Sequence, residues 1–525
     1  MRRRLSIKCH LLRCRVLAAS RGVQEYALVA RCGPPPRSWQ LSRQPILCLV
    51  FICVLIAAGC SHKAPSPENL FRNDHVVPPH ERIRLASGVE VLYFPSPHVP
   101  LFEVEVSFPR GADSDPADYS GLAVMTASLM RKGAGELDES QLVRRLDDLA
   151  AVVEEAVGED RATFGTGGLN KSVDDVLNAF FSVVAVPQLA ETSFSRMKRN
   201  FMDRVEQIAD VPGALVSRVL ALQLLNGTLK GRPSSGFLRD LRMLTVADVK
   251  RYYAMLVQPS KARVLVIGGK DRDEILEPVL RRLEAWTAQR IVDPDAAVDQ
   301  GFKQWQPQAV SAFKAAPGVI TIVQRPGLRE AHVQMGFLGP SRQVPEYSEL
   351  EVAEAILSGP FRSRLNQAIR EKRGLTYGIG GEFNYGEKMS TYVISATCAE
   401  EKAGRLLRET WKQLRLFRNG TSLNDEELSA AKNYLIGSFP LILHDRYNVA
   451  KMYFSALLSG LPEEFLNAYR PGISAVTVES LKVAVKKYFP APPYTTVVVG
   501  DAVKIGPALK AAGISYRVVE AKGFL

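Results

Sequence analysis

The sequence has 525 residues, of which 46% are hydrophobic, 23% charged and 8% aromatic. This length predicts roughly two to four domains, and the composition excludes a disordered chain, a collagen-like chain and a polytopic membrane protein. The formal net charge of +12 is concentrated at the start, where residues 1–59 hold ten Lys and Arg against one acid, Glu25. The rest of the chain holds 57 basic and 54 acidic residues, so a nucleic-acid role loses its main support.

The N-terminal region contains a short apolar run, Ile46 to Ala58, that precedes Gly59 and Cys60. Its thirteen residues suit the core of a secretory signal and fall short of the roughly 20 that a membrane-spanning helix needs. The small residues before Cys60 resemble a bacterial lipobox, in which the cysteine is acylated and becomes the mature N-terminus. A signal anchor or a chance cysteine is the alternative.

We therefore predict a signal segment over 1–59 and a lipidated tether over 60–79, and we interpret residues 1–40 as an over-extended start. The expected location is the bacterial cell envelope, with the protein lipid-anchored in the outer membrane and facing the periplasm. Six of the seven cysteines lie in the first 60 residues, which leaves Cys398 alone in the body. A single body cysteine excludes an internal disulfide framework.

The body begins with two predicted strands, followed by a predicted helix. The first strand covers Val89–Tyr93, and in the second the apolar residues of Phe102–Phe108 alternate with polar ones. A period of two predicts a strand with one buried face. From Leu142 to Val153 apolar residues recur at helical spacing, which predicts a helix there.

A segment of the body occurs twice. Leu244–Gly269 is repeated at Val476–Asp501, with a constant offset of 232 residues. Each copy has a threonine that can cap an amphipathic helix, a turn marked by proline, and a β-branched strand that ends in glycine. Such a repeat predicts two tandem domains of similar architecture.

We place the N-terminal domain at 80–287 and the C-terminal domain at 318–525. The C-terminal domain also contains a predicted strand over Ala331–Phe337 and a predicted helix over Ala403–Leu414. Between the domains, residues 288–317 show no sustained period and are interpreted as a linker. Runs of strands beside runs of helices indicate an α+β architecture.

Two motifs carry a resemblance to a known family. Residues Gly359 to Gly380 read GPFRSRLNQAIREKRGLTYGIG, and Ser120 to Ala123 read SGLA at the start of an expected helix. The chain resembles the pitrilysin/insulinase family of zinc metallopeptidases, also called inverted zincins, over roughly residues 80–505. The resemblance implies a fold like that of mitochondrial processing peptidase, with two homologous α+β domains. Each domain is then an antiparallel-dominated sheet with helices packed on one face.

Catalytic members of this family carry a His-x-x-Glu-His motif after Gly-Leu-Ala, in which two histidines bind zinc and the glutamate is the general base. Here the ligand and base positions hold Val124, Ala127 and Ser128. The third ligand of the family, a glutamate, falls near Arg204 to Glu206, and Glu206 alone cannot hold a catalytic zinc. No two of the seven histidines are four residues apart. We predict that this chain has no catalytic residue and binds neither metal nor another cofactor.

Arg370 and Tyr377 match a pair that contacts the substrate backbone near the scissile bond in this family. The helix that carries Ile369 is expected to end at Gly374, and a strand is expected to start near Leu375, which can bring the arginine back towards the tyrosine. Guanidinium and phenol groups both donate hydrogen bonds to a peptide carbonyl or a developing oxyanion. A purely structural role remains open, because basic residues suit the last turn of a helix and tyrosine suits a strand.

Some members of the family are heterodimers in which one subunit holds the zinc and the other supplies the Arg/Tyr pair. The resemblance implies that this chain is the non-catalytic, substrate-positioning subunit of a heterodimeric zinc peptidase of the bacterial cell envelope. Zinc is then expected in a related catalytic partner chain, and the pair cleaves peptides. The alternative is a non-proteolytic peptide-binding or scaffold lipoprotein with the same fold.

Overall fold

The computed structural model describes residues 76–228, 230–289, 313–316, 318–421 and 423–525. Residues Asn73–Leu525 form one compact unit. The predicted signal segment, Cys60 and most of the predicted linker lie outside the described residues, and helix α9 (Leu276–Gln289) includes the first two linker positions. Within the described ranges, no helix combines the length and the apolar character that a membrane span requires.

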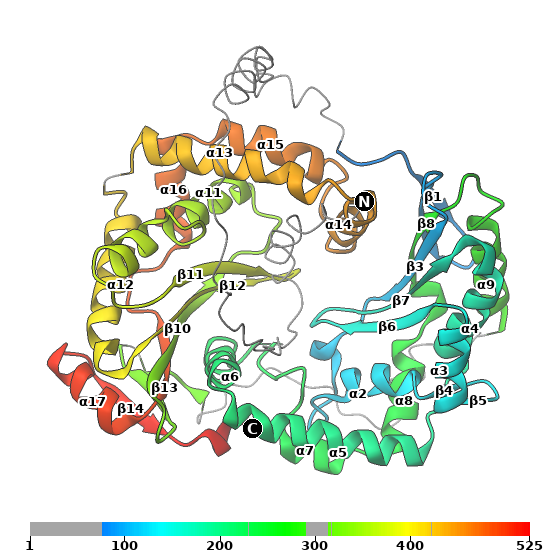
Figure 1. The fold of residues 1–525 in the computed structure, drawn as a ribbon, viewed down its shortest axis with the longest axis horizontal. Helices are drawn as coiled ribbons and strands as arrows, with labels where there is room; N and C mark the ends of the chain where they lie inside the picture. Colours follow the sequence, from blue (N-terminus) through cyan, green and yellow to red (C-terminus); the bar gives the residue numbers. More distant parts are fainter. Residues whose placement is uncertain (1–75, 229, 290–312, 317, 422) are drawn as a thin grey trace, which may run out of the picture. The chain divides into compact units, whose positions relative to one another are not determined.

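The N-terminal half contains a six-stranded sheet in the order β1-β2-β8-β3-β7-β6 (Figure 1). Neighbouring strands are antiparallel except β2 and β8, which are parallel. The strands are β1 (Glu81–Arg84), β2 (Glu90–Phe94), β3 (Leu101–Phe108), β6 (Val152–Val157), β7 (Ala162–Leu169) and β8 (Arg263–Gly268).

Helices cover the face of this sheet that carries the apolar side chains of β3. Phe102, Val104, Val106 and Phe108 are buried there, as the period of two predicts. The helices of this half are α2 (Leu122–Met130), α3 (Glu139–Asp148), α4 (Val173–Ala185), α5 (Glu191–Gln207), α7 (Leu238–Met243), α8 (Val246–Leu256) and α9.

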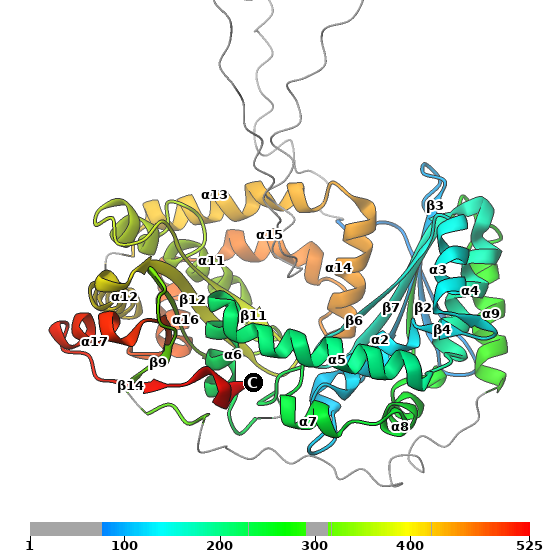
Figure 2. The same cartoon turned by 60° about the horizontal axis from the view of Figure 1, so that its bottom comes forward.

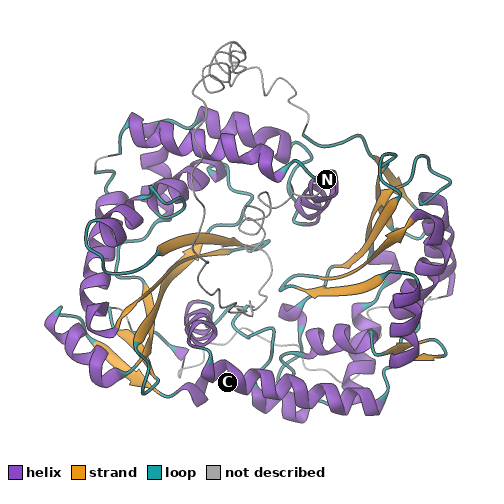
Figure 3. Cartoon of the chain, viewed as in Figure 1, coloured by secondary structure: helices purple, strands orange, loops and turns teal. Residues whose placement is uncertain are grey.

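The C-terminal half contains a second six-stranded sheet, in the order β11-β12-β10-β13-β9-β14, with helices packed against it (Figure 3). Its pairs are antiparallel except those of β9 with β13 and β14. The strands are β9 (Ile320–Gln324), β10 (Glu330–Gly339), β11 (Ile379–Tyr385), β12 (Ser390–Ala399), β13 (Thr495–Gly500) and β14 (Tyr516–Val519). The helices are α11 (Tyr347–Leu357), α12 (Ala403–Arg418), α13 (Asp425–Ile442), α15 (Phe465–Ala475), α16 (Val478–Tyr488) and α17 (Ala502–Ala511).

The predicted α+β fold with two similar, antiparallel-dominated sheets is therefore confirmed. The sequence repeat accounts for corresponding elements in the two halves: α16 and β13 follow α8 and β8 at the 232-residue offset. Thr245 and Thr477 each accept a hydrogen bond from the backbone N–H three residues later and form capping boxes.

One helix from each half packs against the sheet of the other half, on the face opposite its own helices. Helix α6 (Pro212–Leu224) lies against β10 and β13, and helix α14 (Arg446–Leu458) lies against β2 and β8 (Figure 2). Apolar contacts such as Val219 with the second sheet and Phe454 with the first hold these helices in place. The helices of each half thus lie on one face of their own sheet, as expected, and the exchanged helix covers the opposite face.

Two predicted boundaries are corrected. The helix predicted from Leu142 to Val153 ends at Asp148, because Ala150 adopts a left-handed conformation with φ of 48°. Val153 belongs to strand β6 and pairs there with Thr166 of β7. The strand expected near Leu375 begins later, with β11.

Candidate functional site

Helix α2 begins where the sequence predicts it, directly after Gly121. Gly121 has a φ of 90°, a conformation that favours glycine. The buried carboxylate of Asp115 accepts hydrogen bonds from the N–H groups of Gly121, at 2.7 Å, and Ala123, at 2.8 Å. Burial raises the pKa of Asp115 to about 7. Asp115 thus holds the start of the helix that carries the degenerate zinc motif.

The residues at the ligand and base positions are held by contacts within this half. Ala127 is fully buried, and Val124 packs against the core cluster. Ser128 donates a hydrogen bond to Oε1 of Glu155 on β6 at 3.1 Å, and Arg131 forms an ion pair with the same carboxylate. The Glu155 carboxylate is thus already held by two protein donors.

The region expected to supply the third ligand does not provide one. Val205 of α5 is buried in the core, whereas Glu206 is more than half exposed and lies 3.9 Å from Arg242. Within the described residues, no three His, Cys, Asp or Glu side chains come together as a metal site. Val124 has no donor atom, and the Ser128 hydroxyl is bound to Glu155 and is not a usual zinc ligand, so these residues do not fit the metal of the catalytic relatives.

The structure brings Arg370 and Tyr377 together on the surface of the C-terminal half. The guanidinium carbon of Arg370 lies 5.0 Å from the ring centre of Tyr377 and 4.6 Å from that of Phe361. Nε of Arg370 is 3.4 Å from the carboxylate of Glu371, and its Nη groups have no partner among the described residues. Tyr377 is 86% exposed. The stacked guanidinium therefore presents free N–H donors beside a free phenol hydroxyl.

The turn between these two residues is firmly held. Arg370 lies in a π-helix, Asn366–Glu371, a type of turn that is rare and often found at functional sites. Gly374, with a φ of 57°, ends the helix and donates its N–H to the carbonyl of Arg370. Thr376 donates a hydrogen bond to the carbonyl of Thr397 on β12 at 2.6 Å. These contacts fix the segment that carries Tyr377.

Tyr377 also lines a cavity of about 370 Å³ that the sequence did not predict. Its polar lining includes His332, Gln334 and Thr397, and the start of α6 forms another part of the wall. Burial lowers the pKa of His332, which favours a neutral imidazole. The alternation of buried residues along β10 could have revealed that His332 and Gln334 project from its opposite face.

The two similar halves resemble the fold expected from the sequence, and the positions at which catalytic relatives bind zinc hold residues that do not bind it here. Residues 243–435 match the family model described as "Peptidase M16 inactive domain". This match confirms the predicted resemblance to the pitrilysin/insulinase peptidases and fits a chain that holds no metal of its own.

Similar proteins support the same assignment. The non-peptidase homolog YmxG of Helicobacter pylori is 21% identical over 416 residues, which cover 78% of this chain and 91% of that protein. An uncharacterized zinc protease of Streptomyces coelicolor is 21% identical over 72% of this chain and 80% of its own length.

Solved structures share the fold. A peptidase M16 inactive domain from Pseudomonas fluorescens superposes with a TM-score of 0.69 and 22% identity, over 80% of this chain and 98% of that one. The periplasmic protease PqqL of Escherichia coli gives a TM-score of 0.64 and 14% identity, over 81% of this chain and 46% of that one.

Proposed function

We propose that this chain is the non-catalytic, substrate-positioning subunit of a heterodimeric zinc peptidase of the bacterial cell envelope. The observation that carries the proposal is the contrast between Val124, Ala127 and Ser128 at the ligand and base positions and an exposed Arg370–Tyr377 pair. The family description "inactive domain" and the name of the H. pylori relative support a non-catalytic chain. A related chain with an intact His-x-x-Glu-His motif supplies the zinc and the general base.

In this proposal Arg370 and Tyr377 bind the substrate main chain. The rings of Phe361 and Tyr377 occupy positions against the guanidinium, so its Nη donors remain available to a peptide carbonyl. The Tyr377 hydroxyl donates a second hydrogen bond to the same peptide unit. Two donors on a turn that Gly374 and Thr376 hold in place restrict the orientation of the bound peptide.

The proposed location rests on Cys60, which follows the apolar run and small residues of a lipobox. The periplasmic location stated for PqqL is in keeping with an envelope protein. Replacing Cys60 by Ala tests the anchor by membrane fractionation. We expect the variant protein to leave the membrane fraction, and normal processing with full retention there would contradict lipidation.

The decisive test of the catalytic proposal is peptide cleavage by the chain reconstituted with its zinc-bearing partner. Loss of one donor to a developing oxyanion typically lowers kcat by roughly 10²- to 10³-fold, and we expect a loss of this size for Tyr377→Phe. Arg370→Lys keeps the charge but loses the planar set of donors, so turnover also falls. Tyr434→Phe is the matched control, because Tyr434 is 51% exposed on α13.

Complex formation is measured separately by size-exclusion chromatography with light scattering. If both variants assemble and cleave peptides at the wild-type rate, the pair has a structural role. The second candidate, a non-proteolytic peptide-binding or scaffold lipoprotein, then becomes the better account. The exposed polar cavity at Tyr377 favours that candidate independently of any zinc-bearing partner.

A further inference from the structure

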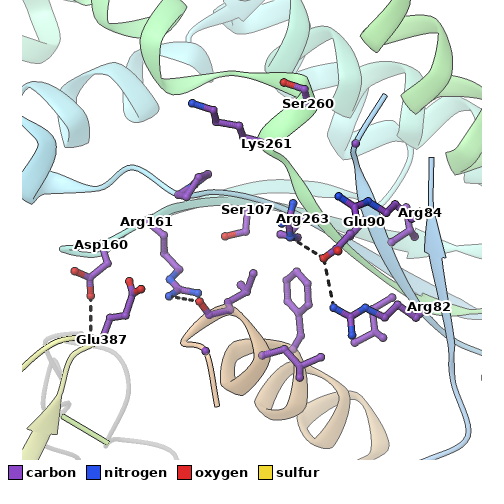
Figure 4. Close-up of a pocket in the computed structure, with 18 residues that line it drawn as sticks. Arg82, Arg84, Glu90, Ser107, Asp160, Arg161, Ser260, Lys261, Arg263 and Glu387 are labelled. Atoms are coloured by element: carbon purple, nitrogen blue, oxygen red, sulfur yellow. Dashed lines mark hydrogen bonds and ion pairs between the residues drawn. The ribbon is translucent and has the colours of Figure 1, made fainter. Parts of the chain in front are cut away.

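A second, larger cavity of about 620 Å³ lies between the first sheet and helix α14 (Figure 4). Its walls include strands β1, β2 and β8 of the N-terminal half and the end of α14 from the C-terminal half. It shares no lining residue with the cavity at Tyr377. The exchange of α14 onto the first sheet therefore creates a site separate from the Arg370–Tyr377 surface.

The strand register places a row of charged side chains along one wall. Arg84 lies opposite Glu90, Glu90 lies beside Arg263, and Arg263 lies opposite Ser107 on β3. Glu90 forms ion pairs with Arg263, at 2.8 Å, and with Arg82, at 3.6 Å. This one carboxylate is thus shared by two guanidinium groups.

Positive charge exceeds negative charge around the cavity. Five Arg and Lys and three Asp and Glu line it, and one of the three, Asp160, also contacts Lys230 at 3.3 Å. The side chains of Arg84 and Lys261 have no hydrogen bond or ion pair within the described part of the chain, and both residues are exposed. Two exposed cations at the wall of a cavity attract an anion.

Arg161 contributes a third cation that reaches into this space from the start of β7 (Figure 4). Its Nη2 group donates to the carbonyl of Leu458, the last residue of α14, at 2.9 Å. That bond uses one of the five N–H groups of the guanidinium, and the nearby carboxylates of Glu387 and Asp160 attract Arg161 without an ion pair among the described residues. Burial lowers the pKa of Arg161, which is the sign of a partly desolvated cation.

The opposite wall is apolar. Phe454, Leu457 and Leu458 of α14 face Leu92 of β2 in this cavity. A small polar anion such as phosphate would leave this wall in contact with water. An anion that carries a large apolar group next to its charge would cover it and gain the free energy of apolar burial.

We propose that this cavity binds a peptide carboxylate that stands next to a large apolar side chain. The cations of the lining, among them Arg84, Lys261 and Arg161, attract the carboxylate, and the apolar side chain lies against Leu457 and its neighbours on α14. The inference rests on the proposed function in that it takes the ligand to be a peptide. It adds a second contact point, through which a peptide end or an acidic side chain is held away from Tyr377.

The test is fluorescence anisotropy with the full-length chain alone and a labelled pentapeptide, Ala-Ala-Ala-Leu-Phe, that has a free α-carboxylate. We expect the C-terminal amide of this peptide to bind at least about tenfold more weakly, since it removes the charge that the three cations bind. A third probe, Ala-Asp-Phe-Ala-Ala amide, carries the carboxylate on a side chain. Tight binding of the third probe assigns the site to acidic side chains, and tight binding of the first assigns it to chain ends.

Variants connect the binding to the cavity. Arg84→Gln combined with Lys261→Gln, and separately Arg161→Gln, should each weaken binding of the free acid about tenfold or more and should leave binding of the amide unchanged. Arg405→Gln combined with Lys412→Gln is the matched control, because both residues are exposed on α12 and remote from the lining. Leu457→Ala tests the apolar wall and should weaken both probes.

Three results would overturn the inference: binding of neither carboxylate probe above the level of the amide, full binding by the Arg84/Lys261 double variant, or stronger binding of dodecanoate than of any peptide. The assay uses no partner subunit, so it is separate from turnover. If the peptide probes do not bind but Tyr377→Phe lowers cleavage by the complex, only the cavity proposal is rejected. If the probes bind as expected but Tyr377→Phe leaves cleavage unchanged, only the proposed function is rejected.

Discussion

The α2 region and the Arg370–Tyr377 surface differ in what their side chains do for the folded chain. At α2, Ala127 and its neighbours are buried in an apolar core, and burial of apolar area at about 25 cal/mol per Å² explains their presence. Tyr377 is 86% exposed, so its ring gains little from packing. Stability accounts for the first region and leaves the second unexplained, which is why we assign binding to the second.

The largest effect on stability is expected from a substitution that disrupts the apolar core at α2. Ala127→Asp places a carboxylate without a partner in the apolar cluster and should lower the free energy of unfolding by about 3 kcal/mol or more. Urea unfolding followed by circular dichroism measures the change. Ala430→Asp, at an exposed position of α13, is the control and should change stability by less than about 0.5 kcal/mol. Equal effects would show that α2 is not part of the core.

The second-largest expected effect is a dependence of stability on pH, to which one buried carboxyl in each half contributes. Burial, followed by repulsion from Glu351, raises the pKa of Glu354 on α11 to about 8, while its Oε2 accepts the N–H of Phe383 at 2.7 Å. The folded chain therefore binds this proton more tightly than the unfolded chain. The stabilisation is complete below a pH of about 4.5 and is lost as pH rises through about 8. Asp115 at α2 acts with the same sign.

Glu354→Gln should keep the acceptor for Phe383 and remove the titration. Urea unfolding at about pH 5 and about pH 8 should then show a smaller loss of stability with rising pH than in the wild type. Glu426→Gln, at an exposed position of α13, should leave the dependence unchanged. A wild-type slope in the Glu354 variant would contradict the buried, protonated carboxyl.

A smaller effect on stability is expected from the exposed contact between Arg370 and Phe361. Phe361→Ala and Arg370→Met should each lower the free energy of unfolding by about 1 kcal/mol or less, because a cation–π contact at an exposed site contributes roughly 0.5–1 kcal/mol. A double-mutant cycle measures the coupling between the two side chains. A coupling near zero would mean that the rings do not orient the guanidinium.

The smallest effect is expected at Glu206. Its contact with Arg242 is 3.9 Å long and exposed, so Glu206→Gln should change stability by less than about 0.5 kcal/mol. Atomic absorption of the purified chain should find the same zinc content before and after the substitution. A loss of bound zinc in the variant would show that Glu206 is a ligand after all.

The repeat made much of the fold predictable. Thr245 and Thr477 identify helix starts through local capping chemistry, and β-branched runs identify β8 and β13, so short-range patterns suffice. The prediction that the helix extends to Val153 was wrong because it also rested on short-range patterns, and these residues permit a helix. Pairing of Val153 with Thr166, a contact across a turn, decides for the strand.

The candidate site was predictable only in part. The spacing of Arg370 and Tyr377 led to the pair, but the contact with Phe361 depends on a π-helix that no periodicity reveals. His332 was passed over because a single histidine in a strand has no motif. Its place beside Tyr377 results from the pairing of β10 with β12 and the approach of α6, which are long-range contacts.

The exchange of α6 and α14 has a consequence for the order in which the protein matures. Leu92 and Leu265 of the first sheet are covered by Val449 and Phe454 of α14, hundreds of residues later in the chain. During synthesis, this face stays uncovered until α14 has been made. Exposed apolar strand faces promote aggregation, and distant contacts slow folding. We therefore expect the N-terminal half to be prone to aggregation until α14 covers its sheet.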